Sequence, residues 1–331
     1  MPHEMLTRQI GRSGIEASVI GLGTWAIGGW MWGGTEEAAS IAAIQASVDE
    51  GVTLIDTAPA YGQGLAEEIV GKALVGRRDK VVLATKCGLV WHTTKGNHFF
   101  DYDGQPVHRY LGKDAIIHEV EQSLKRLRTD RIDHYITHWQ DPTTPIDETM
   151  EALESLKAQG KIRSIGASNT TPADVTAYLA AGQLDAVQEE YSMLKRDLEQ
   201  SLLPLCRENG VSVLSYSSLA LGLLSGKVGP DRVFSGDDQR RDNPRFSQGN
   251  RRKIADFMEK IAPIAEVHGA TLAQAVIAWT VQQPGITFSL CGARTAEQAR
   301  ENAAAGRIRL QPEELTAIST AAARHLIDLD G

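Results

Sequence analysis

The feature that most constrains the fold is a regular alternation of short apolar runs with helical patterns. Runs rich in β-branched residues predict strands at residues 19–22, 52–55, 80–86, 132–137, 162–167, 186–187, 211–215 and 286–290. A helical pattern follows each strand. Such alternation implies a parallel sheet, and eight units suit closure into a (β/α)8 TIM barrel. We therefore expect an α/β protein with one domain over residues 1–331.

A doubly wound dinucleotide-binding fold is the weaker alternative. Six strands are expected of that fold. The Gly21-Leu22-Gly23 run also does not continue into Gly-x-Gly-x-x-Gly with a following helix.

Further elements are expected around the barrel. Two short extended runs, 5–10 and 16–20, with a turn at 11–14, predict an N-terminal β-hairpin. Two long loops, 87–112 and 218–249, are expected at the C-terminal face of the barrel, where long loops are commonly functional. Helices are predicted at residues 35–48, 65–74, 115–127, 146–159, from 172, 198–208, 251–268, 272–282, 296–304 and 315–325.

Charge and composition exclude several classes of protein. A net charge of -8 is unfavourable for a general nucleic-acid binder, which is usually basic. No apolar run is long enough to span a bilayer, and the N-terminus lacks the features of a signal peptide. The cysteines, Cys87, Cys206 and Cys291, are odd in number and far apart, so they are expected to be ordinary thiols. We expect a cytoplasmic protein without nucleic-acid or membrane partners.

Polar residues follow the predicted strands, and a barrel would bring them to one face. A free tyrosine has a pKa of about 10, and a nearby lysine would lower it while a carboxylate holds the lysine in place. A histidine could hydrogen-bond the oxygen being protonated, so this set forms a proton donor facing a carbonyl. It contains no hydride source, so a redox reaction would need a nicotinamide. The strand-end residues are Thr24, Trp25, Asp56 with Tyr61, Lys86, His138, Ser168, Asn169, Gln188, Tyr216 and Ser217.

Five dispersed motifs resemble, in order, the signature of the aldo-keto reductases. The resemblance extends from Gly21-Leu-Gly-Thr24 to Glu301-Asn302, and it is strongest to bacterial branches with Gly-Leu-Leu-x-Gly-Lys (222–227), Asn-Pro-Arg-Phe (243–246) and Gly-Ala-Arg (292–294). The five motifs are Asp56 with Tyr61-Gly62, Thr85-Lys86, His138-Trp139, Ser168-Asn169 and Tyr216-Ser217.

The resemblance implies reduction of an aldehyde or ketone with NADP(H). It implies that Tyr61 is the general acid, that Lys86 and Asp56 tune it, and that His138 orients the carbonyl. Arg294 would bind a 2′-phosphate, which favours NADPH over NADH. The implied cofactor contacts are Thr24, Trp25 and Asp56, then Ser168, Asn169 and Gln188 for the nicotinamide carboxamide and Tyr216 for the ring, then Ser217, Ser218, Leu219, Gly222, Leu224, Gly226 and Lys227 for the pyrophosphate, and Gly292, Arg294, Gln298, Glu301 and Asn302 for the adenosine end.

Some positions depart from the pattern of the family. Ser218 and Cys291 stand where many members have proline, and Gln140 stands where a His-Trp-Pro sequence is common. Gln298 occupies a position where some branches have a phosphate-binding arginine. None of these departures removes a catalytic group.

The substrate is expected to be a small polar or sugar-like carbonyl compound. The predicted pocket residues are Trp25, Trp30, Trp91, Tyr61, His138 and Trp139, beside the 87–112 loop. An anionic substrate is an option if Lys95, Arg109 or Lys113 points inward.

The sequence leaves two alternative functions for this chain. One is a redox-sensing regulatory subunit that binds the cofactor, and the other is a metal-dependent hydrolase using Asp56, His134 and His138. No metal is expected under the reductase hypothesis. The sequence does not indicate an oligomeric state.

Overall fold

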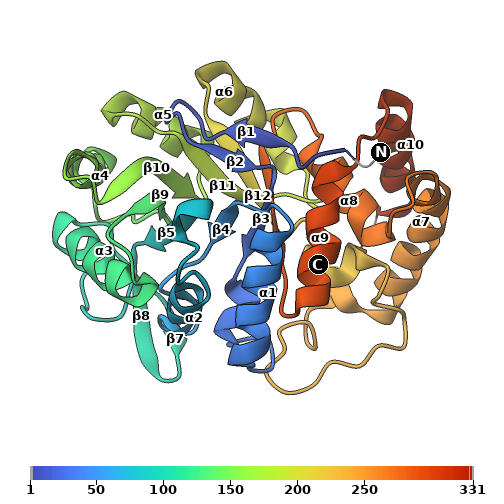
Figure 1. Cartoon of the computed structure of the whole chain (residues 1–331), viewed down its shortest axis with the longest axis horizontal. Helices are drawn as coiled ribbons and strands as arrows, with labels where there is room; N and C mark the ends of the chain where they lie inside the picture. Colours follow the sequence, from blue (N-terminus) through green and yellow to red (C-terminus); the bar gives the residue numbers. More distant parts are fainter. Residues whose placement is uncertain (1–2, 328, 330–331) are drawn as a thin grey trace.

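The computed structural model describes residues 3–327 and 329 and contains the expected closed parallel barrel (Figure 1). The strands follow the order β10-β11-β12-β13-β3-β4-β5-β9, and β9 pairs with β10 to close the ring. The barrel strands are β3 (Ile20–Gly23), β4 (Leu54–Asp56), β5 (Val82–Cys87), β9 (Ile132–Thr137), β10 (Ile162–Ser168), β11 (Ala186–Glu190), β12 (Ser212–Tyr216) and β13 (Phe288–Gly292).

Helices surround the barrel, as the alternating pattern predicts. Most of the apolar core lies between these helices and the outer faces of the strands. The helices are α1 (Glu37–Asp49), α2 (Leu65–Ala73), α3 (Lys113–Leu127), α4 (Ile146–Ala158), α5 (Pro172–Ala181), α6 (Leu202–Asn209), α7 (Gln248–Val267), α8 (Leu272–Val281), α9 (Ala296–Ala304) and α10 (Pro312–His325).

The predicted N-terminal hairpin consists of β1 (Thr7–Gln9) and β2 (Glu16–Ser18). Ile10 and Ile15, on either side of its turn, join a second apolar cluster with inward-facing residues such as Leu54 and Phe288. The hairpin therefore closes the end of the barrel opposite the one where functional residues are expected.

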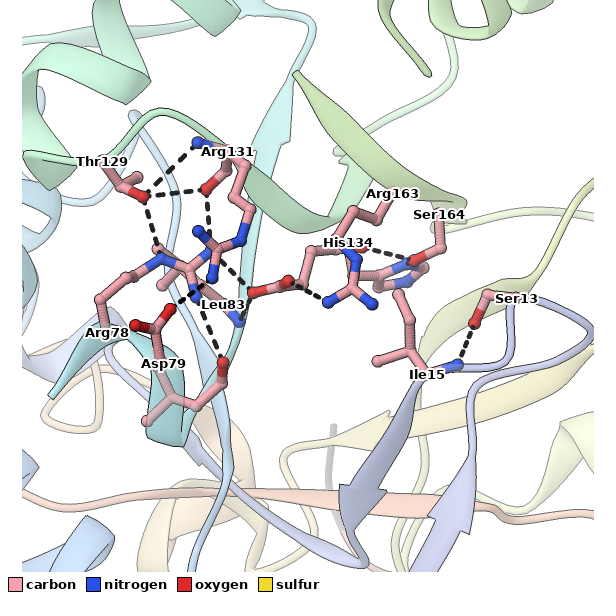
Figure 2. Close-up of polar contacts among 12 residues, drawn as sticks. Ser13, Ile15, Arg78, Asp79, Leu83, Thr129, Arg131, His134, Arg163 and Ser164 are labelled. Atoms are coloured by element: carbon pink, nitrogen blue, oxygen red, sulfur yellow. Dashed lines mark hydrogen bonds and ion pairs between the residues drawn. The ribbon is translucent and has the colours of Figure 1, made fainter. Parts of the chain in front are cut away.

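Polar contacts also tie the strands together near the hairpin. Asp133, at the start of β9, is 1% exposed and accepts the backbone N–H of Leu83 on β5. Its carboxylate also pairs with Arg78 and Arg163 at 2.7 and 2.8 Å, and Figure 2 shows these partners converging from separate elements. A single carboxylate thus links β5, β9 and β10.

The segment 87–112 is not the irregular loop expected from the sequence. It forms a three-stranded antiparallel sheet of β6 (Leu89–Val90), β8 (Gln105–Arg109) and β7 (Asn97–Tyr102). Asp103 and Gly104 make its turn with φ of 49° and 76°, and this positive-φ pair is typical of a tight hairpin. In Figure 1 this hairpin lies at the end of the barrel opposite β1 and β2.

Several boundaries also differ from the expectation. The helix expected at 198–208 breaks into a 3₁₀ turn, Asp197–Gln200, and α6, because Pro204 has no N–H for the fourth carbonyl before it. The last helix begins at Pro312, where a proline suits the first helical position, rather than at 315. The segment 218–249 is mostly loop, as expected, with short 3₁₀ turns at Ala220–Ser225 and Pro244–Phe246.

Among residues 3–327 and 329, no single helix is long and apolar enough to cross a membrane. Helices α7 and α8 together reach that length and composition, but they meet at an angle of 85°.

Candidate active site

Lys86 is the centre of a buried cluster at the C-terminal ends of β4 and β5. Its ammonium Nζ donates to Asp56 Oδ2 at 2.8 Å, to the carbonyl of Thr57 at 2.9 Å and to Tyr61 Oη at 3.1 Å. Lys86 is 0% exposed and Asp56 is 2% exposed. Three of the four residues predicted to be catalytic are therefore joined through one nitrogen.

The turn that carries Tyr61 depends on two glycines. A Cβ on Gly62 would lie 2.4 Å from the carbonyl oxygen of Gly28, and one on Gly28 would lie 2.6 Å from the backbone of Tyr61. Gly62 also has a φ of 67°, which favours glycine. The two backbones can thus approach closely, and Tyr61 lies beside Trp25, whose ring centroid is 6.4 Å from its own.

Burial keeps the phenol of Tyr61 protonated, and neighbouring groups keep the ammonium of Lys86 protonated. Burial raises the pKa of Tyr61, and the opposing charge of Lys86 does not reverse this effect. The lowering expected from the sequence is therefore not the net result. Burial lowers the pKa of Lys86, but Asp56 and Tyr61 outweigh it, so its pKa is raised. The pair is suited to donate a proton from tyrosine rather than to hold a phenolate at neutral pH.

His138 faces Tyr61 from the end of β9. Their ring centroids are 5.7 Å apart and the planes are nearly perpendicular. Burial and, to a smaller extent, the Lys86 charge lower the pKa of His138 well below its ordinary value. A neutral imidazole can donate one N–H to a nearby oxygen without adding a charge.

Three polar residues on neighbouring strands meet beside this cluster. Gln188 Nε2 donates to the other carboxylate oxygen of Asp56 at 2.8 Å. Asn169 Nδ2 donates to the carbonyl of His138 at 2.8 Å, and Asn169 Oδ1 accepts from Tyr216 Oη at 2.7 Å. Ser168 Oγ donates to the carbonyl of Gln188 at 2.7 Å. The predicted carboxamide-binding residues therefore belong to the same network as the predicted catalytic residues.

The loop after β12 has an unusual backbone. Ser217, Ala220 and Leu221 have φ values of 58°, 46° and 58°, a region that residues other than glycine seldom adopt. The backbone N–H groups of Ala220, Gly222 and Leu224 donate to the carbonyls of Ser217 and Leu219, so hydrogen bonds within the loop hold this conformation. The loop also contains Leu219, Gly222, Leu224 and Gly226, which the family resemblance assigns to the pyrophosphate.

Residues 292–302 follow the neighbouring strand, β13. Asn302 Nδ2 donates to the carbonyl of Gly292 at 3.0 Å, and Gln298 Oε1 accepts from the backbone N–H of Arg294 at 2.8 Å. Glu301 pairs with Lys227 at 2.6 Å, so this segment contacts the 217–227 loop.

Arg294 has partners that the sequence did not indicate. Its Nη1 donates to the carbonyl of Trp32 at 2.9 Å, and its Nη2 donates to the carbonyl of Gly34 at 2.6 Å. A guanidinium has five N–H groups, so three remain for another ligand. Arg294 therefore ties the glycine-rich loop after β3 to the loop after β13.

The aromatic residues expected to line the pocket are not all in one place. Trp25 adjoins Tyr61, whereas Trp30 packs against Phe100 and Tyr102 of β7, with centroids 5.4 and 4.7 Å away. Trp139 packs against Phe99 at 5.1 Å. The sheet β6–β8–β7 is therefore anchored to residues on both sides of the catalytic cluster. Trp91, half-buried just after β6, remains a prediction.

The cations suggested for an anionic substrate differ in their surroundings. Lys95 pairs with Asp114 and Lys113 pairs with Glu151, all exposed side chains. Arg109 lies 5.1 Å from the ring of Phe99 and lines a cavity of about 270 Å³ together with Gln140.

Two buried hydroxyls lack hydrogen-bond partners in the part of the chain that the structure describes, which is consistent with a site that binds a cofactor. Within residues 3–327 and 329, Thr24 Oγ1 and Thr57 Oγ1, just after β3 and β4, have no hydrogen-bond partner, although both residues are fully buried. Buried polar atoms are normally paired. Together with the amides of Asn169 and Gln188, they give a donor and acceptor set that suits a nicotinamide carboxamide and ribose.

Gln140 and Glu189 contribute to the site although the sequence did not assign them. Gln140 Nε2 donates to the carbonyl of Ser168 at 3.0 Å, and Glu189 accepts two bonds from Thr170. The departure from the family pattern at position 140 was a signal for the first. The polar run Gln188-Glu189-Glu190 at the end of a buried strand was a signal for the second.

The residues of the metal-dependent alternative are not assembled as a metal centre. His134 Nδ1 shares a hydrogen bond of 2.8 Å with Ser164 Oγ, and burial lowers the pKa of His134 to about 3. Among residues 3–327 and 329, no group of three or more histidines, cysteines or carboxylates could hold a metal. Cys87, Cys206 and Cys291 are buried free thiols, as expected.

Comparison with known proteins places this geometry in a family. The model of the Aldo/keto reductase family matches residues 19–323. The aldo-keto reductase YhdN of Bacillus subtilis (strain 168) is 44% identical over 292 residues, which cover 87% of this chain and 85% of that protein. The NADH-specific methylglyoxal reductase of Escherichia coli (strain K12) is 41% identical over 313 residues, covering 93% and 95%.

Comparison with solved structures also finds aldo-keto reductases. The glycerol dehydrogenase AKR11B4 of Gluconobacter oxydans has a TM-score of 0.87 and 37% identity, covering 96% of this chain and 95% of its own. An aldo/keto reductase of Klebsiella pneumoniae in complex with NADP and acetate has a TM-score of 0.71 and 32% identity, covering 94% and 93%.

Proposed function

This chain belongs to the aldo/keto reductase family, and we propose that it reduces a small polar aldehyde or ketone with NADPH, using Tyr61 as the proton donor. The observation that carries the proposal is the contact of Lys86 Nζ with both Asp56 and Tyr61. That contact gives a tyrosine an adjacent fixed positive charge, which general acid catalysis by a phenol requires.

The protein residues would act on the carbonyl oxygen. Tyr61 would donate its proton to that oxygen, and Lys86 would stabilise the phenolate that remains. Asp56 keeps the buried lysine charged, and the neutral imidazole of His138 would donate a hydrogen bond that orients the carbonyl. The bound nicotinamide supplies the hydride.

Two relatives guide the choice of substrate. Their names refer to methylglyoxal and glycerol, both three-carbon compounds with polar groups. Histidine and aromatic side chains lie together near the cluster, which suits a small oxygenated carbonyl compound better than a large apolar one. We therefore propose three-carbon carbonyl compounds such as methylglyoxal, glyceraldehyde and dihydroxyacetone as the first substrates to test.

The preference for NADPH depends on Arg294. Three of its N–H groups are available for a 2′-phosphate, and structural relatives bind NADP or NADPH. The relative named as NADH-specific makes NADH the necessary comparison.

The test is steady-state oxidation of NADPH and of NADH with this set of carbonyls, for the natural protein and for Tyr61→Phe. We expect turnover with NADPH and a loss in kcat of about 10²- to 10⁴-fold in Tyr61→Phe, with NADPH still bound. Tyr110→Phe is a matched control, because the Tyr110 hydroxyl bonds to Asp114 in an exposed position. Absence of turnover on every carbonyl, or an unchanged kcat in Tyr61→Phe, would contradict the proposal.

A further inference from the structure

The turn formed by Ser168, Asn169 and Thr170 is held from several sides. Asn169 has a φ of 56°, a left-handed conformation that asparagine tolerates better than most residues but that still needs support. The backbone N–H of Asn169 bonds to the carbonyl of Gln188, and its side chain bonds to the carbonyl of His138 and to Tyr216. The position of the Asn169 amide therefore depends on what fixes this turn.

Glu189 holds the far end of the turn. It follows Gln188 on β11, and because side chains alternate along a strand, it points away from the barrel interior, toward the helices. It is 4% exposed, and its Oε1 accepts the backbone N–H of Thr170 at 2.8 Å and the hydroxyl of Thr170 at 2.7 Å. Thr170 is itself buried, so water does not replace these bonds easily.

We propose that Glu189 is a positioning residue that fixes the Ser168–Thr170 turn for binding of the nicotinamide carboxamide, and that its ionisation makes cofactor affinity increase with pH. The inference rests on the proposed function, because it assumes that a nicotinamide cofactor binds at Asn169.

The physical reason is the strength of the two bonds. A carboxylate accepts hydrogen bonds more strongly than a protonated carboxyl group does. Burial raises the pKa of Glu189 to about 7, although the bonds from Thr170 oppose the shift. The ionised form therefore prevails on the alkaline side of neutrality, and the turn is held less firmly on the acid side.

The neighbouring Glu190 pairs with Arg245, whereas Glu189 forms no ion pair within residues 3–327 and 329. Asp174 on α5 raises its pKa further. Burial raises the pKa of Cys206 on α6 and of Tyr216 on β12, and the charge of Glu189 adds to both shifts, as does that of Glu190 for Tyr216, so both groups are neutral around pH 7. Of these groups, Glu189 is the one expected to change charge near neutrality.

The test compares the natural protein with Glu189→Gln, which keeps an acceptor oxygen but cannot ionise. The dissociation constant of NADPH is measured by protein fluorescence at about pH 6 and about pH 8, on either side of the Glu189 pKa. We expect Glu189→Gln to bind about fivefold more weakly at the higher pH, the difference between a charged and a neutral acceptor, and equally well at the lower pH. The 2′-phosphate of NADPH also titrates, with a second pKa of about 6. Because this affects both proteins equally, it cancels in the ratio of their dissociation constants at each pH.

Two further readouts separate positioning from general structural support. The loss in Glu189→Gln should lie in the dissociation constant of NADPH and be smaller in kcat measured at saturating NADPH and carbonyl. Glu119→Gln is the matched control, because Glu119 is also buried, with a pKa raised by burial to about 8, but it bonds to the backbone N–H of Gly88 instead of this turn. The ratio of its NADPH dissociation constant to that of the natural protein should be the same at both pH values.

The outcomes are distinct. A ratio for Glu189→Gln that is the same at both pH values overturns this inference and leaves the proposed function intact. Failure of the natural protein to bind NADPH or NADH at either pH overturns the proposed function, and this inference with it.

Discussion

The protonation states of Tyr61 and Lys86 follow from a competition between burial and charge. Burial removes water from both groups, which favours the neutral form of each. Asp56, with no more than 3% of its side chain exposed, restores the charge of Lys86, so the pKa of the ammonium is raised. Tyr61 has no such compensation beyond Lys86 itself, and its pKa is raised as well. Both protons are therefore held at neutral pH.

This balance predicts the pH dependence of carbonyl reduction. In the proposed reaction, reduction consumes the proton of Tyr61, so its rate falls only as the pH rises through the Tyr61 pKa, which burial raises above its ordinary value. His138 is already neutral, since its pKa is well below the ordinary value. At saturating NADPH, kcat/KM for a carbonyl that does not itself ionise should stay flat from about pH 6 to about pH 9.

Saturating cofactor matters in this experiment because it removes any effect of Glu189 on cofactor affinity. A break near pH 6.5 would mean that His138 titrates in the working range. A fall near pH 8 would mean that Lys86 lowers the Tyr61 pKa after all, as the sequence alone suggested.

At the level of elements, the sequence predicted what depends on local pattern. Strand and helix periods alternate along the chain, and Asp56, Lys86 and His138 lie at or just after strand ends, so their arrival at one face could be inferred. The sheet β6–β8–β7 was missed because its aromatic residues do not alternate with polar ones. Its Asp103-Gly104 turn was a usable signal.

The contacts between elements could not be inferred. Asp133 has no motif around it, yet it bonds to the backbone of β5 and to two arginines. Likewise, Glu189 bonds to Thr170, 19 positions earlier in the chain, and Gln140 bonds to Ser168, 28 positions later. Such partners depend on how strands are placed side by side.

Asp133 therefore provides a prediction for stability. Asp133→Asn should lower the free energy of unfolding by about 3 kcal/mol, because it leaves the mostly buried Arg78 without its carboxylate. Asp133 lies at the end of the barrel away from the catalytic cluster, so kcat should be unchanged where the variant is folded. Urea unfolding and steady-state kinetics on the same preparation measure the two effects.

Asp130→Asn is the control, because Asp130 is 88% exposed in its own pair with Arg131. This substitution should lower the free energy of unfolding by less than about 1 kcal/mol. Equal losses for the two variants would show that the bonds of Asp133 to three elements add nothing to stability.

For the molecule as a whole, closure of the barrel brings the loops after its first and last strands together at the proposed cofactor site. Strand β13 pairs with β3, so the loops that follow them become neighbours. Arg294 after β13 then reaches the carbonyls of Trp32 and Gly34 after β3. The sequence indicated which loops would meet, but the carbonyl partners of Arg294 depend on the backbone path of a glycine-rich loop and could not be read from it.

If Arg294 both supports the loop after β3 and binds the 2′-phosphate, as proposed, Arg294→Ala has two expected effects. Loss of the bonds to the 29–34 loop should weaken NADPH and NADH alike, and loss of a guanidinium beside the 2′-phosphate should weaken NADPH by a further factor of about 10 to 100. A ligand that binds only the folded protein raises its stability in proportion to the logarithm of its concentration over Kd. The rise in Tm at a fixed cofactor concentration should therefore shrink more for NADPH than for NADH.

Arg300→Ala serves as the matched control, because Arg300 is an exposed arginine on the neighbouring helix α9 and should leave both Tm shifts unchanged. An equal reduction for NADPH and NADH in Arg294→Ala would limit Arg294 to supporting the loop. Specificity for the 2′-phosphate would then have to come from another cation near the adenosine end, of which Lys227 is the nearest candidate through its pair with Glu301. In that case Lys227→Ala would produce the NADPH-specific loss that Arg294→Ala did not.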